Sequence, residues 1–332
     1  MKDLKARFRG CLLGGAIGDA LGYPVEFFSE ERIKKHYGDR GIRRFGNTTK
    51  AAFISDDTQM TLFTAEGLLL AKKRGETLKR SIYLSYLDWL KTQTENYSEE
   101  GEGLMAIPEL YDDRAPGMTC LGALNSGLMG GIASPINNSK GCGGVMRTSP
   151  VALYCFAKGV SIEGADELAA EAAAITHGHT LGHLPSYALN HIIYKLLEGE
   201  EIEQAVEMAI AATEKRYAYD KSADLGISKI RNALSFALDP HVTDKEAIEN
   251  LGEGWVAEEA LAVALYCAVA HKDSFEDAVC LAVNHKGDSD STGAITGNIL
   301  GAYIGIDEIP DFYTEGVELR EVILDMADRL LG

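Results

Sequence analysis

Apolar residues recur along the chain mainly at the three- and four-residue spacings of amphipathic helices. Residues 58–74 are the clearest case, since Met60, Leu62, Phe63 and positions 68–70 give this segment an apolar-rich surface. Further helices are predicted at residues 162–175, 202–215, 258–270, 275–283 and 319–331. Long alternating strand patterns are absent from the sequence. The pattern therefore predicts an all-α chain, with loops near residues 38–54, 93–118 and 133–150.

Two apolar segments carry a glycine at every fourth position, at Gly10, Gly14, Gly18 and Gly22 and again at Gly293, Gly297, Gly301 and Gly305. This spacing keeps the glycines roughly on one face of a helix. Each helical glycine costs up to ~1 kcal/mol relative to alanine, so the repeat needs a compensating gain. Close approach of two central helices is the simplest one, and glycine-rich loops are the alternative. The intervening Leu, Ile, Ala and Tyr residues favour buried helices.

Composition places these helices in one acidic domain. The chain has 332 residues, 46% of them apolar, and no low-complexity linker, which predicts a single domain over residues 1–332. The net charge of −18 disfavours binding to nucleic acid or anionic membranes. The six cysteines show no Cys-x-x-Cys spacing, so we expect a reducing, cytoplasmic location. The first apolar stretch is short and is interrupted by Asp19. We therefore expect neither a signal peptide nor a membrane span.

The first acidic cluster, Ser55-Asp56-Asp57-Thr58, stands where the helix over 58–74 should begin. A capping serine followed by acidic first-turn residues is a common helix start. Two adjacent carboxylates and two hydroxyls also form a hard-oxygen ligand set for Mg²⁺, Mn²⁺ or Ca²⁺. Both interpretations remain open for this cluster alone.

The second cluster, Asp288-Ser289-Asp290-Ser291, immediately precedes the second glycine repeat. It resembles the first half of an EF-hand loop, but position twelve of that loop would be Ile299 instead of a bidentate glutamate. The EF-hand interpretation therefore fails. Four carboxylates held together would repel one another and need cations between them, as in a dinuclear site. Two unrelated capped helices are the alternative.

Two further segments carry candidate chemistry. Residues 141–147 lack the P-loop pattern, but successive glycines let backbone N–H groups close around a phosphate. A flexible turn is the alternative, and Arg147 is either a phosphate ligand or a structural anchor. His177, His179 and His183 invite a zinc hypothesis, which lacks a neighbouring cysteine or acidic third ligand.

Several of these motifs, in this order, resemble the ADP-ribosylglycohydrolase family, which includes dinitrogenase reductase-activating glycohydrolases and ADP-ribosylarginine hydrolases. The similar segments are the glycine-repeat helix at residues 8–22, Ser-Asp-Asp-Thr at 55–58, Arg-Ala-Pro-Gly-Met-Thr-Cys at 114–120, the glycine-rich Met-Arg loop at 141–147, Thr-His at 176–177 and Gly-Asp-Ser-Asp-Ser at 287–291. The resemblance implies a compact all-α fold, an orthogonal helical bundle around a central dinuclear metal site.

The resemblance also implies roles for individual residues. The implied ligands of two Mg²⁺ or Mn²⁺ ions are Ser55, Asp56, Asp57, Asp288, Asp290 and Ser291. The family more often has threonine at the positions of Ser55 and Ser291, and Thr292 could compete with Ser291. The implied substrate-binding residues are Gly117, Thr119, Gly141, Cys142, Gly143, Gly144, Met146 and His177. Glu26, which on its own reads as a surface carboxylate, becomes the leading acid or base, with Asp57 and Asp290 as further catalytic candidates.

The implied reaction is metal-assisted hydrolysis of the bond between ADP-ribose and an acceptor. Similarity of residues 114–119 to the arginine-directed members favours ADP-ribosylarginine on a protein. Serine-linked ADP-ribose, O-acetyl-ADP-ribose and other conjugates are alternatives within the same chemistry. A non-catalytic ADP-ribose-binding or crystallin-like structural protein is the third hypothesis.

Overall fold

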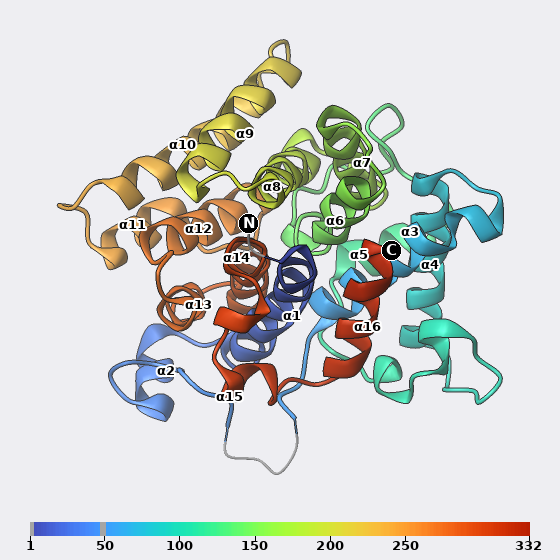
Figure 1. Cartoon of the computed structure of the whole chain (residues 1–332), viewed down its shortest axis with the longest axis horizontal. Helices are drawn as coiled ribbons and strands as arrows, with labels where there is room; N and C mark the ends of the chain where they lie inside the picture. The colour runs from blue at the N-terminus through green and yellow to red at the C-terminus, as the bar shows by residue number, and fades with distance from the viewer. Residues whose placement is uncertain (1–2, 47–50) are drawn as a thin grey trace.

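The computed structural model describes residues 3–46 and 51–332, and its helices confirm the all-α prediction (Figure 1). The described residues contain no β-strand, only isolated bridges. The α-helices are α1 (Leu4–Gly22), α2 (Glu30–Tyr37), α3 (Asp56–Arg74), α4 (Leu78–Thr94), α5 (Met118–Asn125), α6 (Ser149–Ala157), α7 (Ile162–Ala174), α8 (Thr180–Glu198), α9 (Ile202–Arg216), α10 (Ala223–Leu238), α11 (Asp244–Leu251), α12 (Ala257–Ala270), α13 (Phe275–Val283), α14 (Ser289–Ile304), α15 (Asp311–Thr314) and α16 (Arg320–Leu331).

The predicted helices agree with α3, α7, α9, α12, α13 and α16 to within about two residues at either end. Of the predicted loops, the segment near 93–118 contains two short 3-10 helices, at Gly103–Ala106 and Pro108–Tyr111. Positions 47–50 of the loop near 38–54 lie outside the described residues. No helix in the described ranges is long and apolar enough to cross a membrane.

The two glycine repeats form the central contact of the fold. They lie on α1 and α14, which pack antiparallel and side by side at the centre of the molecule (Figure 1). A Cβ atom on Gly14 would lie 2.5 Å from the carbonyl oxygen of Gly297, and one on Gly18 would overlap that of Gly293. Only glycine allows the two backbones to come this close. The prediction of two helices in close approach is therefore correct.

The ends of the two repeats differ from the predicted pattern. Gly22 meets Ser289 instead of a glycine, and Gly305 ends α14 with a φ of 82°. The side-chain amide of Asn298 donates to the Cys11 carbonyl oxygen at 2.8 Å, which adds a polar tie between the helices. The contact of Gly22 with Ser289 sets the last turn of α1 beside the first turn of α14.

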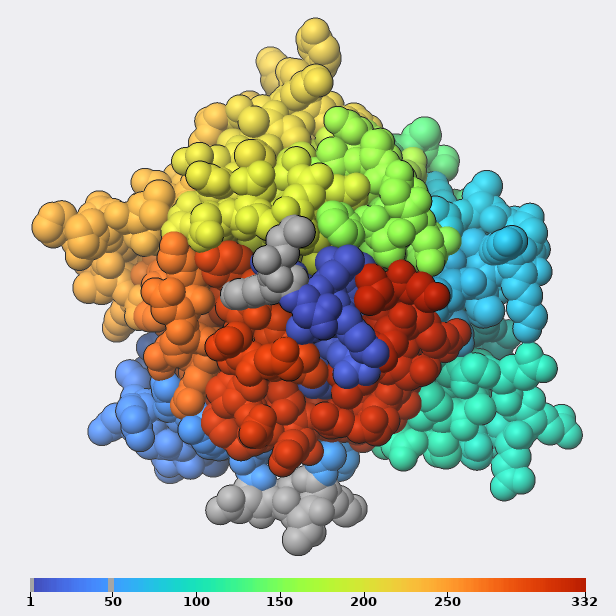
Figure 2. All heavy atoms as spheres, in the orientation of Figure 1, coloured from blue at the N-terminus to red at the C-terminus, as the bar shows by residue number. Residues whose placement is uncertain are grey.

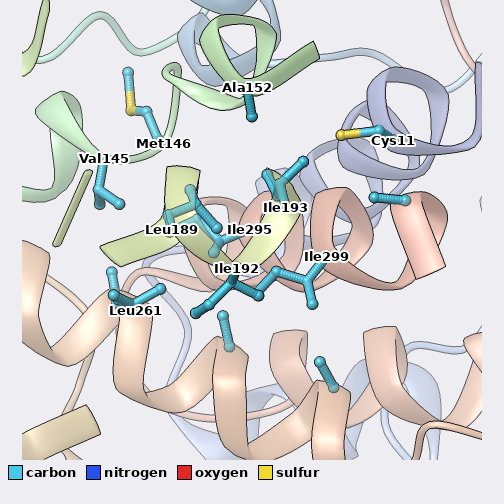
Figure 3. Packing of buried hydrophobic residues seen from close by; sticks show 14 of the residues in the cluster. Cys11, Val145, Met146, Ala152, Leu189, Ile192, Ile193, Leu261, Ile295 and Ile299 are labelled. Atoms are coloured by element: carbon cyan, nitrogen blue, oxygen red, sulfur yellow. The ribbon is translucent and has the colours of Figure 1, made fainter. Parts of the chain in front are cut away.

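The hydrophobic core wraps around this pair. Ile295 and Ile299 of α14 face Leu189, Ile192 and Ile193 of α8, with Leu261 of α12 beside them (Figure 3). All six side chains are fully buried. Ile299, the residue that excludes an EF-hand, is thus a core residue.

The first and last helices meet at the surface. Figure 2 shows the start of α1 (blue) lying against C-terminal segments (red). The Arg9 guanidinium binds both carboxylate oxygens of Asp328 on α16, at 2.7 and 2.6 Å. Paired hydrogen bonds of this kind fix the orientation of both side chains.

We expect Gly297→Ala to destabilise the protein by about 1–3 kcal/mol, although alanine favours helices, because its Cβ would overlap the Gly14 carbonyl oxygen. Urea unfolding followed by circular dichroism measures the change. Gly122→Ala in α5 is the matched control, since nothing lies within 4 Å of its new Cβ. Equal stability of the two variants would contradict the importance of the helix contact.

Candidate metal centre

The first acidic cluster forms the start of α3. Ser55 is the N-cap residue, and its Oγ accepts a hydrogen bond from the Asp57 N–H at 3.2 Å. Asp56 Oδ2 accepts one from the Gly117 N–H at 3.0 Å. Both carboxylates are buried. Capping therefore explains Ser55, but it leaves the burial of two neighbouring carboxylates unexplained.

Asp19, a fully buried carboxylate on α1, fixes this helix start in place. It accepts hydrogen bonds from the Ser55 N–H at 3.0 Å, from the Thr58 N–H at 3.1 Å and from the Thr58 hydroxyl. Burial raises the pKa of Asp19 to about 7, and the nearby Asp290 adds repulsion. Asp19 is not among the site residues predicted from the sequence. Its only signal was a charged residue inside an apolar, glycine-rich segment.

The second cluster forms the start of α14. Asp288 is the N-cap residue, and its Oδ1 accepts from the Ser291 N–H at 3.3 Å, while Asp290 Oδ1 accepts from the same N–H at 3.0 Å. The Asp288 N–H donates to the Glu253 carbonyl oxygen at 2.8 Å. Gly287 makes this approach possible with a φ of 138°, which side chains disfavour.

Of the two neighbouring hydroxyls, only Ser291 lines the cavity next to the cluster. The Thr292 hydroxyl instead hydrogen-bonds to the Ala282 and Asp288 carbonyl oxygens, at 2.7 and 2.8 Å, and to His285 Nε2 at 3.0 Å. Thr292 therefore does not compete with Ser291 for a place at the cavity wall.

The two clusters meet at one cavity of about 220 Å³. Its acidic wall comes from three separate parts of the chain and consists of Glu26, Asp56, Asp57, Asp288 and Asp290. Carboxylate oxygens of Glu26, Asp288 and Asp290 lie within 4.8 Å of one another. Ser55 is not part of the wall, because it is fully buried with its hydroxyl turned to Asp57 at 3.4 Å. Its predicted role as a metal ligand stays a prediction.

The electrostatics of this wall favour a cation. Burial, with repulsion from Asp290 and Asp56, raises the pKa of Glu26 to about 9, and burial also raises the pKa of Asp57 well above its ordinary value. Asp57 Oδ1 and Glu26 Oε2 are buried without a hydrogen-bond partner. Carboxylate oxygens are the ligand atoms that Mg²⁺ and Mn²⁺ prefer, and these two oxygens make no hydrogen bond that would compete with a cation. The residues present therefore fit the implied divalent cations.

The glycine-rich loop at residues 141–147 also lines the cavity. Gly141, Cys142, Gly143 and Met146 line the cavity, whereas Gly144 is buried against the Gly182 carbonyl oxygen. The loop is joined to the acidic wall, since Cys142 Sγ donates to Asp288 Oδ2 at 2.7 Å.

The flexible-turn alternative is not favoured, because glycine at these positions has a packing reason. A Cβ on Gly143 would lie 3.0 Å from Cys120 Sγ and 3.1 Å from His177 Cε1. A side chain at position 143 would therefore crowd Cys120 and His177, which lie against the loop.

His177 lines the cavity next to this loop, and Arg147 is the last residue of the loop. The His177 ring is buried, with Nδ1 2.8 Å from the Thr176 hydroxyl, and burial lowers its pKa to about 3, so the imidazole is neutral. Arg147 is fully buried and donates to the same hydroxyl at 2.7 Å and to the Ala172 carbonyl oxygen at 3.3 Å. Arg147 is thus a structural anchor.

The zinc hypothesis finds no support in the geometry of the other two histidines. His179 caps α8 by accepting from the Leu181 N–H at 3.0 Å. His183 Nδ1 lies 3.2 Å from the Tyr217 hydroxyl. The candidate cation-binding group found among the described residues consists of carboxylates alone.

The remaining cavity residues include both expected and unexpected side chains. Gly117 and Thr119 line the cavity, as predicted for substrate-binding residues. Trp255, which is not among the predicted site residues, also lines the cavity from the segment before α12. A single tryptophan after Gly-Glu-Gly carries no signal of its own in the sequence.

Comparison with known proteins places this arrangement in a family. A family model described as ADP-ribosylglycohydrolase matches residues 1–332. An uncharacterised protein of Archaeoglobus fulgidus is 31% identical over 98% of this chain and 96% of its own length. The ADP-ribosyl-[dinitrogen reductase] glycohydrolase of Rhodospirillum rubrum is 25% identical over 95% and 91%, and human ADP-ribosylhydrolase ARH3 is 22% identical over 98% and 93%.

A solved structure agrees with these relatives in fold. The chain described as an ADP-ribosylglycohydrolase-related protein complex superposes with a TM-score of 0.69 at 24% identity, covering 100% of this chain and 99% of its own. The match extends over the whole α-helical arrangement described above. The chain belongs to the ADP-ribosylglycohydrolase family and is a hydrolase that acts on glycosyl bonds.

Proposed function

We propose that this protein hydrolyses the bond between C1″ of ADP-ribose and an arginine side chain of a modified protein, with two Mg²⁺ or Mn²⁺ ions as cofactors. Asp56, Asp57, Asp288, Asp290 and Ser291 would hold the cations. When bound, the cations supply Lewis-acid stabilisation of the sugar oxygens and of a nearby water. Serine-linked ADP-ribose and O-acetyl-ADP-ribose are the alternative substrates.

One observation carries this proposal: five buried carboxylates from distant parts of the chain line the same cavity. Such a cluster costs folding free energy unless cations neutralise it, so it is typical of a functional site. A non-catalytic crystallin-like role would not require these carboxylates to remain together.

The side chains around the cavity can divide the proton transfers between them. Glu26 lies in the cavity beside the other carboxylates, where its carboxyl group can protonate the leaving nitrogen. Asp57 or Asp290 can accept the proton of the attacking water. Fixed carboxylates also stabilise the positive charge of an oxocarbenium-like transition state.

The charge of the cavity supports arginine as the acceptor. No lysine or arginine is found among the described residues that line it. Arg114 lies just outside and is engaged with Glu318 and Asp112, each at 2.9 Å. A guanidinium entering this cavity would therefore meet no basic side chain of the protein among the described lining residues. The peptide N–H groups of the glycine-rich loop are the corresponding donors for the diphosphate.

We expect release of ADP-ribose from ADP-ribosylarginine in the presence of Mn²⁺, measured by chromatography beside serine-linked ADP-ribose and O-acetyl-ADP-ribose. Glu26→Gln should lower kcat by about 100-fold through loss of the acid. The double variant D56N/D290N should lose nearly all turnover through loss of the cation site.

Asp307→Asn, which removes an exposed carboxylate, controls for net charge. Unchanged turnover in D56N/D290N would refute the metal mechanism. Faster hydrolysis of the serine-linked substrate than of ADP-ribosylarginine would show that serine, and not arginine, is the acceptor.

Cation binding should also change the pH dependence of stability. The pKa of Glu26 rises from 4.5 to about 9 and that of Asp19 from 3.8 to about 7 on folding, so both groups destabilise the metal-free protein when ionised. This cost is largest above each raised pKa and decreases as the pH falls from that value toward the ordinary pKa of the group.

We therefore expect Mn²⁺ to raise Tm by at least ~2 °C more at a pH of about 9 than at about 6 in differential scanning fluorimetry. KCl at equal ionic strength is the control for general screening. A larger Mn²⁺ effect at the lower pH would contradict this assignment.

A further inference from the structure

An aromatic pair spans the rim of the cavity next to Glu26. The rings of Phe27 and Trp255 are stacked, with centroids 5.6 Å apart and planes inclined by 19°. Phe27 is 71% exposed, whereas its neighbour Glu26 is only 9% exposed and points into the cavity. The stack thus joins the residue after Glu26 to a ring from a distant segment of the chain.

Trp255 belongs to a segment that is tied firmly to both walls of the site. Gly254 has a φ of 85°, and a Cβ there would lie 2.9 Å from Thr292 Cγ2. Beyond the tryptophan, Val256 forms a bridge with Gly141, and the Ala257 N–H donates to the Lys140 carbonyl oxygen at 2.9 Å. Trp255 is therefore a fixed platform attached to the glycine-rich loop and the α14 start.

Glu26 has no comparable attachment of its own. Its Oε2 is buried without a hydrogen-bond partner, and its charged neighbours Asp290, Asp56 and Asp19 repel it when ionised. It follows the short 3-10 helix η1 (Tyr23–Val25), whose Val25 is fully buried. On the C-terminal side of Glu26, the Phe28 N–H donates to the Val25 carbonyl oxygen at 2.8 Å, and the Phe27 ring reaches across to the segment of Trp255.

We propose that Phe27 and Trp255 form a clasp, defined as this stacked pair, which holds Glu26 in the cation centre. Both are positioning residues: they act through the backbone that Phe27 shares with Glu26. This inference rests on the proposed function for the role of Glu26 in the reaction. The placement of Glu26 among the carboxylates can be measured without turnover.

Calorimetric titration with Mn²⁺ tests the clasp in the full-length protein. Glu26→Gln should weaken Mn²⁺ binding, and Phe27→Ala and Trp255→Ala should each weaken it by about two- to tenfold, the range that an aromatic pair supplies. Trp255→Phe keeps a stacking ring and should bind Mn²⁺ like the wild type. The exposed Tyr219→Ala is the matched control for removing an aromatic ring from the surface.

A double-mutant cycle separates positioning from a general packing effect. In the Glu26→Gln background, Phe27→Ala should cause no further loss of Mn²⁺ affinity. Additive losses of Mn²⁺ affinity in the double variant would overturn the proposal. Wild-type Mn²⁺ affinity in Phe27→Ala or in Glu26→Gln would also overturn it. So would a loss of affinity in Trp255→Phe as large as the loss in Trp255→Ala.

Fluorescence reports on the stack itself. Trp89, the other tryptophan, is fully buried, so acrylamide should quench mainly Trp255, and more strongly after Phe27→Ala. Unchanged quenching would show that the rings do not stack in solution. If the variants change Mn²⁺ affinity and fluorescence quenching as expected but the protein releases no ADP-ribose, the proposed function is wrong and the positioning role of Phe27 and Trp255 is still supported.

Discussion

The close approach of α1 and α14 is the contact on which the geometry of the site depends. The glycine repeats let the two backbones touch, and this sets the end of α1 against the start of α14 at Gly22 and Ser289. Asp19, one turn earlier on α1, holds the start of α3 through Ser55 and Thr58. One helix therefore places both acidic clusters, and a shift of α1 would move them relative to each other.

Much of this arrangement could be predicted from local patterns. The glycine repeat, the apolar periodicity and the acidic helix starts are short-range features, and they indicated the all-α fold and the two acidic clusters. Glu26, Gly117 and Thr119 were assigned from the family resemblance. The partners of single residues could not be predicted, because they depend on contacts between distant segments. Asp19 looked like an interruption of an apolar stretch, and nothing near Trp255 indicated that it reaches the cavity. The hydroxyl of Ser55 is turned to Asp57, and this orientation could not be predicted from the sequence.

The buried carboxylates needed for the cation site lower the stability of the metal-free protein. Burial and mutual repulsion raise the pKa values of Glu26, Asp57 and Asp288, so their charged forms are unfavourable in the metal-free fold. The surrounding helices tolerate this because they share one large hydrophobic core (Figure 3). Folding free energy from the core thus maintains a centre that a cation would stabilise.

The pairing of the first long helix with α14 also has a consequence for how the protein is made. During synthesis α1 emerges first, but the helix that must cover its glycine face is among the last to leave the ribosome. At about 5–20 residues per second, the nascent chain would wait many seconds with that face unpaired. Contacts of such long sequence separation also slow folding. The acidic cavity can therefore assemble only after nearly the whole polypeptide has been translated, and an incomplete chain cannot form it.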